Sequence, residues 1–239
     1  MIIEGPATAN YDEDLGTYPI TDWYVRNVYQ LGIAAEMGAP PTADTTLING
    51  TMKVGTVGSY AKTNITSGKK YRLRLINTSV DNMFQVSLDG HDFEVIAADL
   101  VPIQPFNTTW LFIGIGQRYD VIIRANQAPT KYWFRASVPS AFCGANTLSR
   151  AGGIKAIFTY TNGNSTSPTA EPISNPLTPF PAVCGDQTGL VPKLAKPVPA
   201  NEFIFHDNNG QNKLTLALTS RPSPNRPAPA TVNSWRVNG

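Results

Sequence analysis

The sequence contains two histidines, His91 and His206, and two cysteines, Cys143 and Cys184, whose imidazole and thiolate groups are common ligands of transition metals. A mononuclear site with two histidines and one cysteine needs these groups close together, and a multinuclear cluster needs further imidazoles. No histidine follows closely after Cys184. We therefore expect no metal ion bound to this chain. His91 is interpreted as a structural residue after a turn, or as a partly buried side chain with one hydrogen-bond partner.

The cysteines and the asparagine sequons point to a secreted protein. Cys143 and Cys184 form an even pair, compatible with one disulfide that closes a large loop. The candidate glycosylation sites, each an Asn-x-Ser/Thr sequon, are Asn49, Asn64, Asn107 and Asn164. A further sequon at Asn77 falls inside a predicted strand and is not counted among them. Sequons also arise by chance in a chain rich in Thr and Asn.

The first residues do not resemble a secretion signal. Residues 1–14, MIIEGPATANYDED, contain neither a basic segment nor an apolar one. Because the other features point to secretion, we expect the natural N-terminus to lie upstream of Met1.

Composition limits the classes of partner. The 239 residues carry a formal net charge of +2, with 15% charged residues and no basic run. Nucleic acid is therefore not an expected partner. No apolar window is long enough to span a bilayer, so a membrane is not expected either.

Alternation with period two between residues 60 and 160 indicates short β-strands. In residues 69–78, for example, Tyr71, Leu73 and Leu75 alternate with arginines. Asp89-Gly90 separates the alternating segments 83–88 and 91–98 and predicts a β-hairpin. Further strands are expected within 15–24, 108–116, 118–125, 131–138 and 154–161, and one short helix within 25–38. Strands of this length and spacing predict an antiparallel sandwich or barrel.

The last third of the sequence is organised differently. Residues 162–200 are proline-rich and without period, which predicts an extended connection. Residues 201–207 and 212–220 alternate again like strands of a new unit, and 233–239 begin another segment. A second domain therefore begins here, and we expect it to be incomplete.

Several stretches taken together resemble a known family. They are GPATANYDEDLGTYPITDWY, GAPP followed by LINGT, YRLRLINTSVDNMFQVSLDGHDFEVIAADLVPI, and GQRYDVIIRAN. In this order they resemble the middle cupredoxin domain of fungal multicopper oxidases, above all the laccases of ascomycetes. The tail that ends in WRVNG looks like the opening of the third cupredoxin domain.

The resemblance implies a fold and a division into domains. The fold is all-β, a cupredoxin-like (plastocyanin-like) Greek-key β-sandwich with one short helix and an extended Pro-rich C-terminal connection. Residues 1–13 would end the first cupredoxin domain or its linker, and 14–161 would form the second domain. Residues 162–200 would be the linker, and 201–239 the incomplete start of the third domain.

The resemblance also implies a reaction that needs parts outside this chain. A laccase oxidises phenolic donors and reduces O₂ to water, with copper held by histidine-rich motifs of its first and third domains. None of those motifs occurs in this chain. We therefore expect copper in the full-length laccase of which this chain would be a part, called the parent below. We expect no copper bound to this chain and no activity of the chain alone. The expected partners are the first and third domains, a phenolic donor and O₂.

A site role is implied for three residues. Asp81 matches the carboxylate of the family's donor pocket, and Ala39 and Pro40 match a loop that lines this pocket. A carboxylate there would accept the phenol's proton as the electron leaves. The alternative for Asp81 is that it caps a turn, as Asp-Asn pairs commonly do. Met83 and Thr42 stand where relatives often carry a histidine and a bulky aromatic, so the donor preference stays open.

Two other functions are considered. The chain could be one subunit of a split oxidase that works with separately made flanking domains. It could also be a glycosylated β-sandwich that binds carbohydrate or protein, which would need an exposed aromatic platform. The tryptophans Trp23, Trp110, Trp133 and Trp235 are dispersed along the chain, mostly in strand patterns, which does not favour such a platform.

Overall fold

The computed structural model describes residues 5, 7–38, 41–139, 143, 148, 154–162, 171–197, 199, 216–222 and 231–237. Contacts divide the chain into two compact units. The first unit comprises Met1–Tyr24 and Thr42–Leu194, and the second comprises Val25–Pro41 and Ala195–Gly239. Each unit is described by itself.

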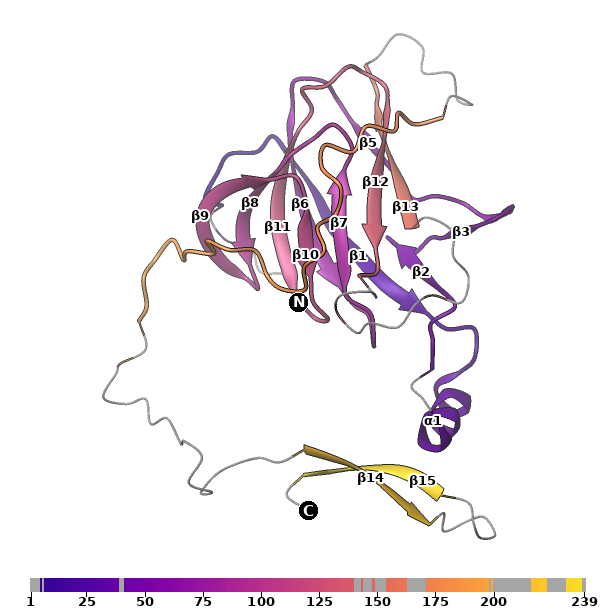
Figure 1. The fold of residues 1–239 in the computed structure, drawn as a ribbon. Coiled ribbons are helices and arrows are strands. Elements are labelled where there is room, and N and C mark those ends of the chain that lie inside the picture. The colour runs from indigo at the N-terminus through magenta and orange to yellow at the C-terminus, as the bar shows by residue number, and fades with distance from the viewer. Residues whose placement is uncertain are drawn as a thin grey trace. The chain divides into compact units, whose positions relative to one another are not determined.

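The first unit is a sandwich of two β-sheets (Figure 1). The six-stranded sheet has the order β2-β1-β6-β11-β8-β9. Its strands are β1 (Glu13–Trp23), β2 (Thr45–Ile48), β6 (Lys70–Asn77), β8 (Phe93–Ala98), β9 (Val101–Thr108) and β11 (Arg118–Arg124). The five-stranded sheet has the order β10-β7-β12-β13-β5. Its strands are β5 (Lys62–Ile65), β7 (Phe84–Leu88), β10 (Leu111–Ile113), β12 (Lys131–Ser137) and β13 (Ile154–Tyr160). The predicted β-sandwich is confirmed.

Successive strands of this unit repeatedly change sheet, as in Greek-key sandwiches. Most neighbouring strands are antiparallel, but β1 pairs with β6 and β13 with β5 in parallel. The strands of each of these two pairs are far apart in the sequence, so local alternation could not predict that they pair. A separate small ribbon consists of β3 (Lys53–Val54) and β4 (Val57–Gly58).

The core lies between the two sheets and is rich in aromatic side chains. Phe134 on β12 is fully buried and contacts Tyr18 on β1 and Phe158 on β13, with ring centroids 5.3 and 6.1 Å apart. The predicted alternation on β6 is also visible, because Tyr71, Leu73 and Leu75 are all buried in this core. Burial of apolar and aromatic surface is the main stabilising term for such a sandwich.

The prediction of a β-hairpin at Asp89-Gly90 was wrong. The chain does turn there, and Leu88 and His91 form an isolated bridge. However, β7 and β8 belong to different sheets, so the turn leads across the core. A two-residue hairpin turn of type I′ needs positive φ at both central residues. Only Gly90 has it, with φ of 72°, whereas Asp89 does not.

The extended segment 171–194 runs along the sandwich of the first unit. The backbone N–H of Ile173 donates to Lys131 on β12, and the N–H groups of Gln104 and Lys193 connect β9 with residues 191–193. The predicted disulfide between Cys143 and Cys184 is confirmed, with the two Cα atoms 5.2 Å apart. The segment is therefore held to the sandwich covalently as well as by hydrogen bonds.

The second unit contains α1 (Val28–Met37) and a two-stranded ribbon of β14 (Leu216–Pro222) and β15 (Thr231–Val237). The predicted short helix is confirmed. It begins with a capping box, in which Asn27 and Gln30 bond each other's backbone N–H groups. The strand predicted at 201–207 lies outside the described residues. Among the described residues, no helix has the length and apolarity needed to cross a membrane.

Candidate functional site

The loop that carries Asp81 connects β6 to β7 and is fixed by side chains at both ends. Asn77, at the end of β6, is fully buried and donates from its amide to the carbonyls of Asn82 (2.9 Å) and Ile113 (3.0 Å). Its side-chain oxygen accepts the backbone N–H of Ser79 at 2.9 Å. The loop is thus tied to the strand from which it emerges.

A buried carboxylate on β1 accepts the central backbone N–H groups of this loop. Asp22 Oδ1 accepts from Val80 N at 2.9 Å. Its other oxygen, Oδ2, accepts from Asp81 N at 2.9 Å and from Asn82 N at 3.1 Å. The Asp22 backbone N–H in turn donates to Ser79 Oγ at 2.9 Å. Hydrogen bonds to a carboxylate are stronger than those between neutral groups, so this contact sets the shape of the loop.

The surface beside Asp81 combines a carboxylate with apolar and phenolic groups. Asp81 itself is half-buried. The neighbouring Val80 is 80% exposed. Tyr24 is half-buried, and burial together with the charges of Asp22 and Asp81 raises its pKa to about 12. Its hydroxyl therefore stays protonated and hydrogen-bonds to Asp22.

The structure says less about the other residues that the sequence analysis connects with this pocket. Ala39 and Pro40 lie outside the described residues. Thr42 is exposed and Met83 is half-buried. Asp81 therefore remains the one predicted pocket residue whose surroundings the described part of the chain defines.

His91 is a buried structural residue with two hydrogen-bond partners rather than one. Its Nδ1 lies 2.8 Å from the carbonyl oxygen of Asp89, and its Nε2 lies 2.8 Å from the hydroxyl of Tyr160. A carbonyl can only accept, so Nδ1 carries the proton and neutral Nε2 accepts from Tyr160. Burial lowers the pKa of His91 below its usual value near 6.5. The neutral ring is the form that fits these partners.

This arrangement predicts a loss of stability at acidic pH. The unfolded chain protonates His91 near pH 6.5, whereas the folded chain does so only at lower pH. The unfolded state then binds more protons, so the contribution of neutral His91 is present above pH 6.5 and is lost below it. We expect the difference in unfolding free energy between wild type and His91→Gln to shrink from about pH 7.5 to about pH 5.5. Denaturant titrations at both pH values measure it. A constant difference would contradict the prediction.

The described side chains do not fit a copper site. Both ring nitrogens of His91 are engaged as above, and Cys143 and Cys184 are joined in a disulfide. Within the described ranges, no group of three or more His, Cys, Asp or Glu side chains could hold a metal ion. His206 lies outside those ranges. The described residues therefore provide no site at which a bound metal ion could take part in a reaction.

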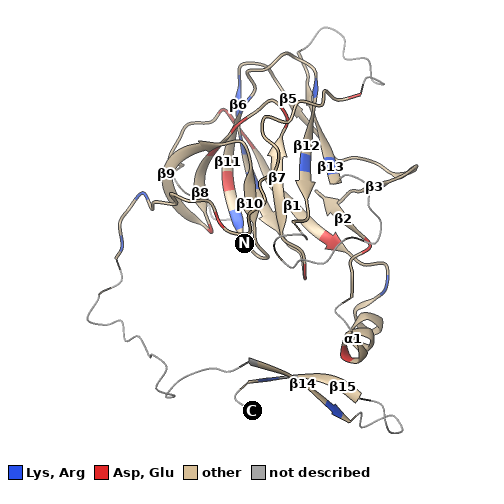
Figure 2. Cartoon of the chain, viewed as in Figure 1, with Lys and Arg blue, Asp and Glu red and all other residues tan. Residues whose placement is uncertain are grey.

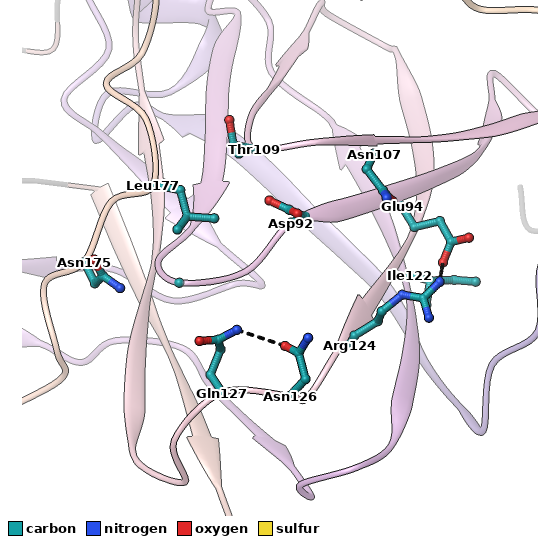
Figure 3. Close-up of a pocket in the computed structure, with 11 residues that line it drawn as sticks. Asp92, Glu94, Asn107, Thr109, Ile122, Arg124, Asn126, Gln127, Asn175 and Leu177 are labelled. Carbon is teal, nitrogen blue, oxygen red and sulfur yellow. Dashed lines mark hydrogen bonds and ion pairs between the residues drawn. The ribbon is translucent and has the colours of Figure 1, made fainter.

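A polar pocket of about 440 Å³ lies elsewhere on the sandwich (Figure 3). Asp92, Glu94, Asn107 and Arg124 belong to its lining, and Arg124 forms an ion pair with Glu94. Asp81 is not among its lining residues. Since sites for aromatic small molecules are mostly apolar, this pocket does not suit a phenolic donor.

The charged residues, coloured on the ribbon in Figure 2, are dispersed along the described chain. On the six-stranded sheet, Arg72 pairs with Asp120 and Arg74 with Asp14. On the other sheet, Arg135 pairs with the buried Asp89. Pairing of this kind neutralises the basic residues of the strands locally.

The sequon residues differ in exposure. Asn49, Asn64 and Asn107 are exposed, whereas Asn77 is fully buried and hydrogen-bonded. Asn164 lies outside the described residues.

A two-layer sandwich with frequent changes of sheet is the architecture of cupredoxin-like domains, and the match to a solved laccase structure identifies it as one. The family model for multicopper oxidases matches residues 15–163, and the chain belongs to this family. Copper is thereby implied for the parent proteins of the family.

The relatives and solved structures agree with this assignment. The chain is 53% identical to Laccase-3 of Botryotinia fuckeliana, covering 100% of this chain and 50% of that protein. It is 40% identical to a laccase of Neurospora crassa, covering 100% of this chain and 36% of that protein. The crystal structure of a laccase from Botrytis aclada superposes with a TM-score of 0.73 at 34% identity, covering 99% of this chain and 42% of that one. The chain thus spans half or less of the length of these proteins.

Proposed function

We propose that this chain supplies the middle domain of a laccase-like oxidase and part of the wall of its donor pocket. The observation that carries the proposal is the 53% identity to Laccase-3 over the whole chain. It is supported by the described residues, among which no three or more His, Cys, Asp or Glu side chains gather in a way that could hold a metal ion. The parent would oxidise phenolic donors and reduce O₂ to water. Copper would be held by other parts of the parent, so this chain would be inactive alone.

Within this proposal, residues 14–161 form the second cupredoxin domain and 1–13 the end of the first domain or its linker. Residues 162–200 are the connection, and 201–239 begin the third domain. The partners are the first and third cupredoxin domains, and the parent is secreted.

The proposed chemical role of this chain is to receive a proton. A phenol becomes strongly acidic when it loses an electron, so a base within hydrogen-bond reach lowers the barrier. Asp81 is this base in our proposal. Val80, exposed next to it, offers an apolar contact for the donor ring.

A hybrid oxidase tests the proposal. The segment of Laccase-3 from Botryotinia fuckeliana that matches this chain is replaced by the chain, and the hybrid is expressed with copper. We expect copper binding, a blue absorption band and phenol oxidation in the hybrid, and none of these in the chain alone. Stoichiometric copper with blue colour in the chain alone, or a folded, copper-loaded hybrid without turnover, would contradict the proposal.

The split-oxidase alternative predicts a different result when the segments are produced separately. Mixing this chain with separately produced flanking segments of the same laccase would then restore copper-dependent turnover without a covalent connection. The comparisons do not favour the alternative of a carbohydrate- or protein-binding module.

Secretion predicts a pattern of glycosylation that follows burial. In chain secreted from a fungal host, we expect glycans at the exposed Asn49, Asn64 and Asn107 and none at Asn77. A glycan on Asn77 would displace a fully buried amide that makes three hydrogen bonds. Mass spectrometry of glycopeptides from the folded protein measures this. A glycan on Asn77 in folded protein would contradict the buried position.

A further inference from the structure

We propose that Asp22 is a positioning residue for the donor site, because it holds the loop that presents Val80 and Asp81. This inference rests on the proposed role of Asp81. Asp22 would not touch the donor. It would act through the backbone of residues 80–82, whose N–H groups it accepts.

The geometry argues for a dedicated anchor rather than an incidental contact. Asp22 is only 4% exposed, yet no basic side chain is among the described groups that hydrogen-bond to it. Its hydrogen-bond donors are the backbone N–H groups of residues 80–82, the side-chain amide of Asn82 at 3.4 Å and the hydroxyl of Tyr24. Burying a carboxylate is costly unless several hydrogen bonds satisfy it. Here the bonds that satisfy it all fix the loop next to the proposed site or the adjoining end of β1.

The anchor also explains how opposite kinds of side chain share one loop. Val80 is 80% exposed although it is apolar, and Asp81 is half-buried although it is charged. With their backbone N–H groups fixed on Asp22, Val80 points outward beside Asp81. A ring of a phenolic donor could then contact the valine while its hydroxyl reaches the carboxylate.

Asp22→Asn is the decisive substitution because it keeps the shape but replaces one oxygen by an NH₂ group. An NH₂ group at the Oδ1 position faces the N–H of Val80, and at the Oδ2 position it faces those of Asp81 and Asn82. At least one loop N–H loses its acceptor in either orientation. Asp89→Asn is the control for loss of a buried carboxylate elsewhere: Asp89 accepts a backbone N–H from Asn175 and also pairs with Arg135, away from this loop.

The first measurement is hydrogen exchange of the backbone N–H groups in the full chain under native conditions. In Asp22→Asn, we expect those of Val80, Asp81 and Asn82 to exchange about tenfold faster or more. In Asp89→Asn, we expect them to exchange at the wild-type rate. Unchanged exchange in Asp22→Asn, or equal acceleration in both variants, would overturn the inference.

The second measurement is a double-mutant cycle in the copper-loaded hybrid, with kcat/KM for a phenolic donor. If Asp22 acts through Asp81, Asp22→Asn lowers kcat/KM about tenfold or more when Asp81 is present and has little effect in Asp81→Asn. Equal losses in both backgrounds would mean a merely structural role and would overturn the inference while the proposed function stands. If Asp81→Asn alone has no effect, the proposed role of Asp81 fails, and with it the reason to position this residue.

Discussion

Replacing Asp81 by Asn in the copper-loaded hybrid should lower kcat/KM for a phenolic donor about 100-fold, which is the lower range for removal of a catalytic base. Asparagine keeps the size of the side chain and the hydrogen bond from its backbone N–H to Asp22. It cannot take the proton that a phenol releases when it is oxidised. The loss should therefore fall on proton-coupled donors. Steady-state kinetics with a phenol series measures it.

Ferrocyanide is the matched donor, because it loses one electron and no proton. We expect its oxidation by Asp81→Asn to be unchanged or slightly faster, since the anion meets one negative charge less. Asp92→Asn is the matched variant, because Asp92 is an exposed carboxylate in the polar pocket of Figure 3. It should affect neither donor. An equal loss with phenol and ferrocyanide would show that Asp81 supports the site as a whole and does not accept a proton.

Most of the longer strands could be predicted from uninterrupted alternation, whereas the short strands β2 and β5 and the proline-containing β9 were not predicted. The strands β6, β7, β8, β11, β12 and β13 all lie within predicted segments. The strand β9 was missed because Pro102 and Pro105 break its pattern. It follows β8 through a tight turn at Asp99 and Leu100, both with positive φ. Leucine is an unusual residue for this conformation, so no turn signal marked it.

The error at Asp89-Gly90 has a different physical origin. A turn signal specifies a local reversal of the chain, but it does not specify whether the two flanking strands pair with each other. All five residues of β7 are buried, and this strand pairs on both edges, with β10 and β12, and not with β8. The carboxylate of Asp89 turns to Arg135 on β12 and helps to keep the turn on that sheet.

The role of Asp81 was reached by resemblance, whereas Asp22 carried a signal in the residues themselves. With period two, Asp22 lies on the same face of β1 as Tyr18 and Ile20, which are both buried. An acidic residue on the core face of a strand needs several hydrogen-bond donors nearby. That requirement could have predicted a buried anchor. Its partners could not be predicted, because the β6–β7 loop is distant in the sequence and meets β1 only through the parallel pairing of β1 with β6.

Replacing Arg135 by Met should lower the free energy of unfolding by about 3 kcal/mol or more, the usual cost of removing one partner from a buried ion pair. The guanidinium of Arg135 contacts both carboxylate oxygens of Asp89 at 2.7 Å, and it also donates to Ser174. The side chain of Asp89 is 0% exposed. Without Arg135, this carboxylate keeps the N–H of Asn175 as its one described hydrogen-bond donor and loses its counter-charge.

Arg124→Met is the control, because Arg124 pairs with Glu94 at the surface and its side chain is 47% exposed. We expect it to cost no more than about 1 kcal/mol, as exposed pairs do. Urea titrations of the wild type, both variants and Arg135→Met/Asp89→Asn measure the four free energies. Since Asp89→Asn removes the unpaired charge, the double variant should lose less than the sum of the two single losses. If Arg135→Met costs no more than Arg124→Met, water reaches Asp89 in solution, and the pair does not hold the β7–β8 turn to β12.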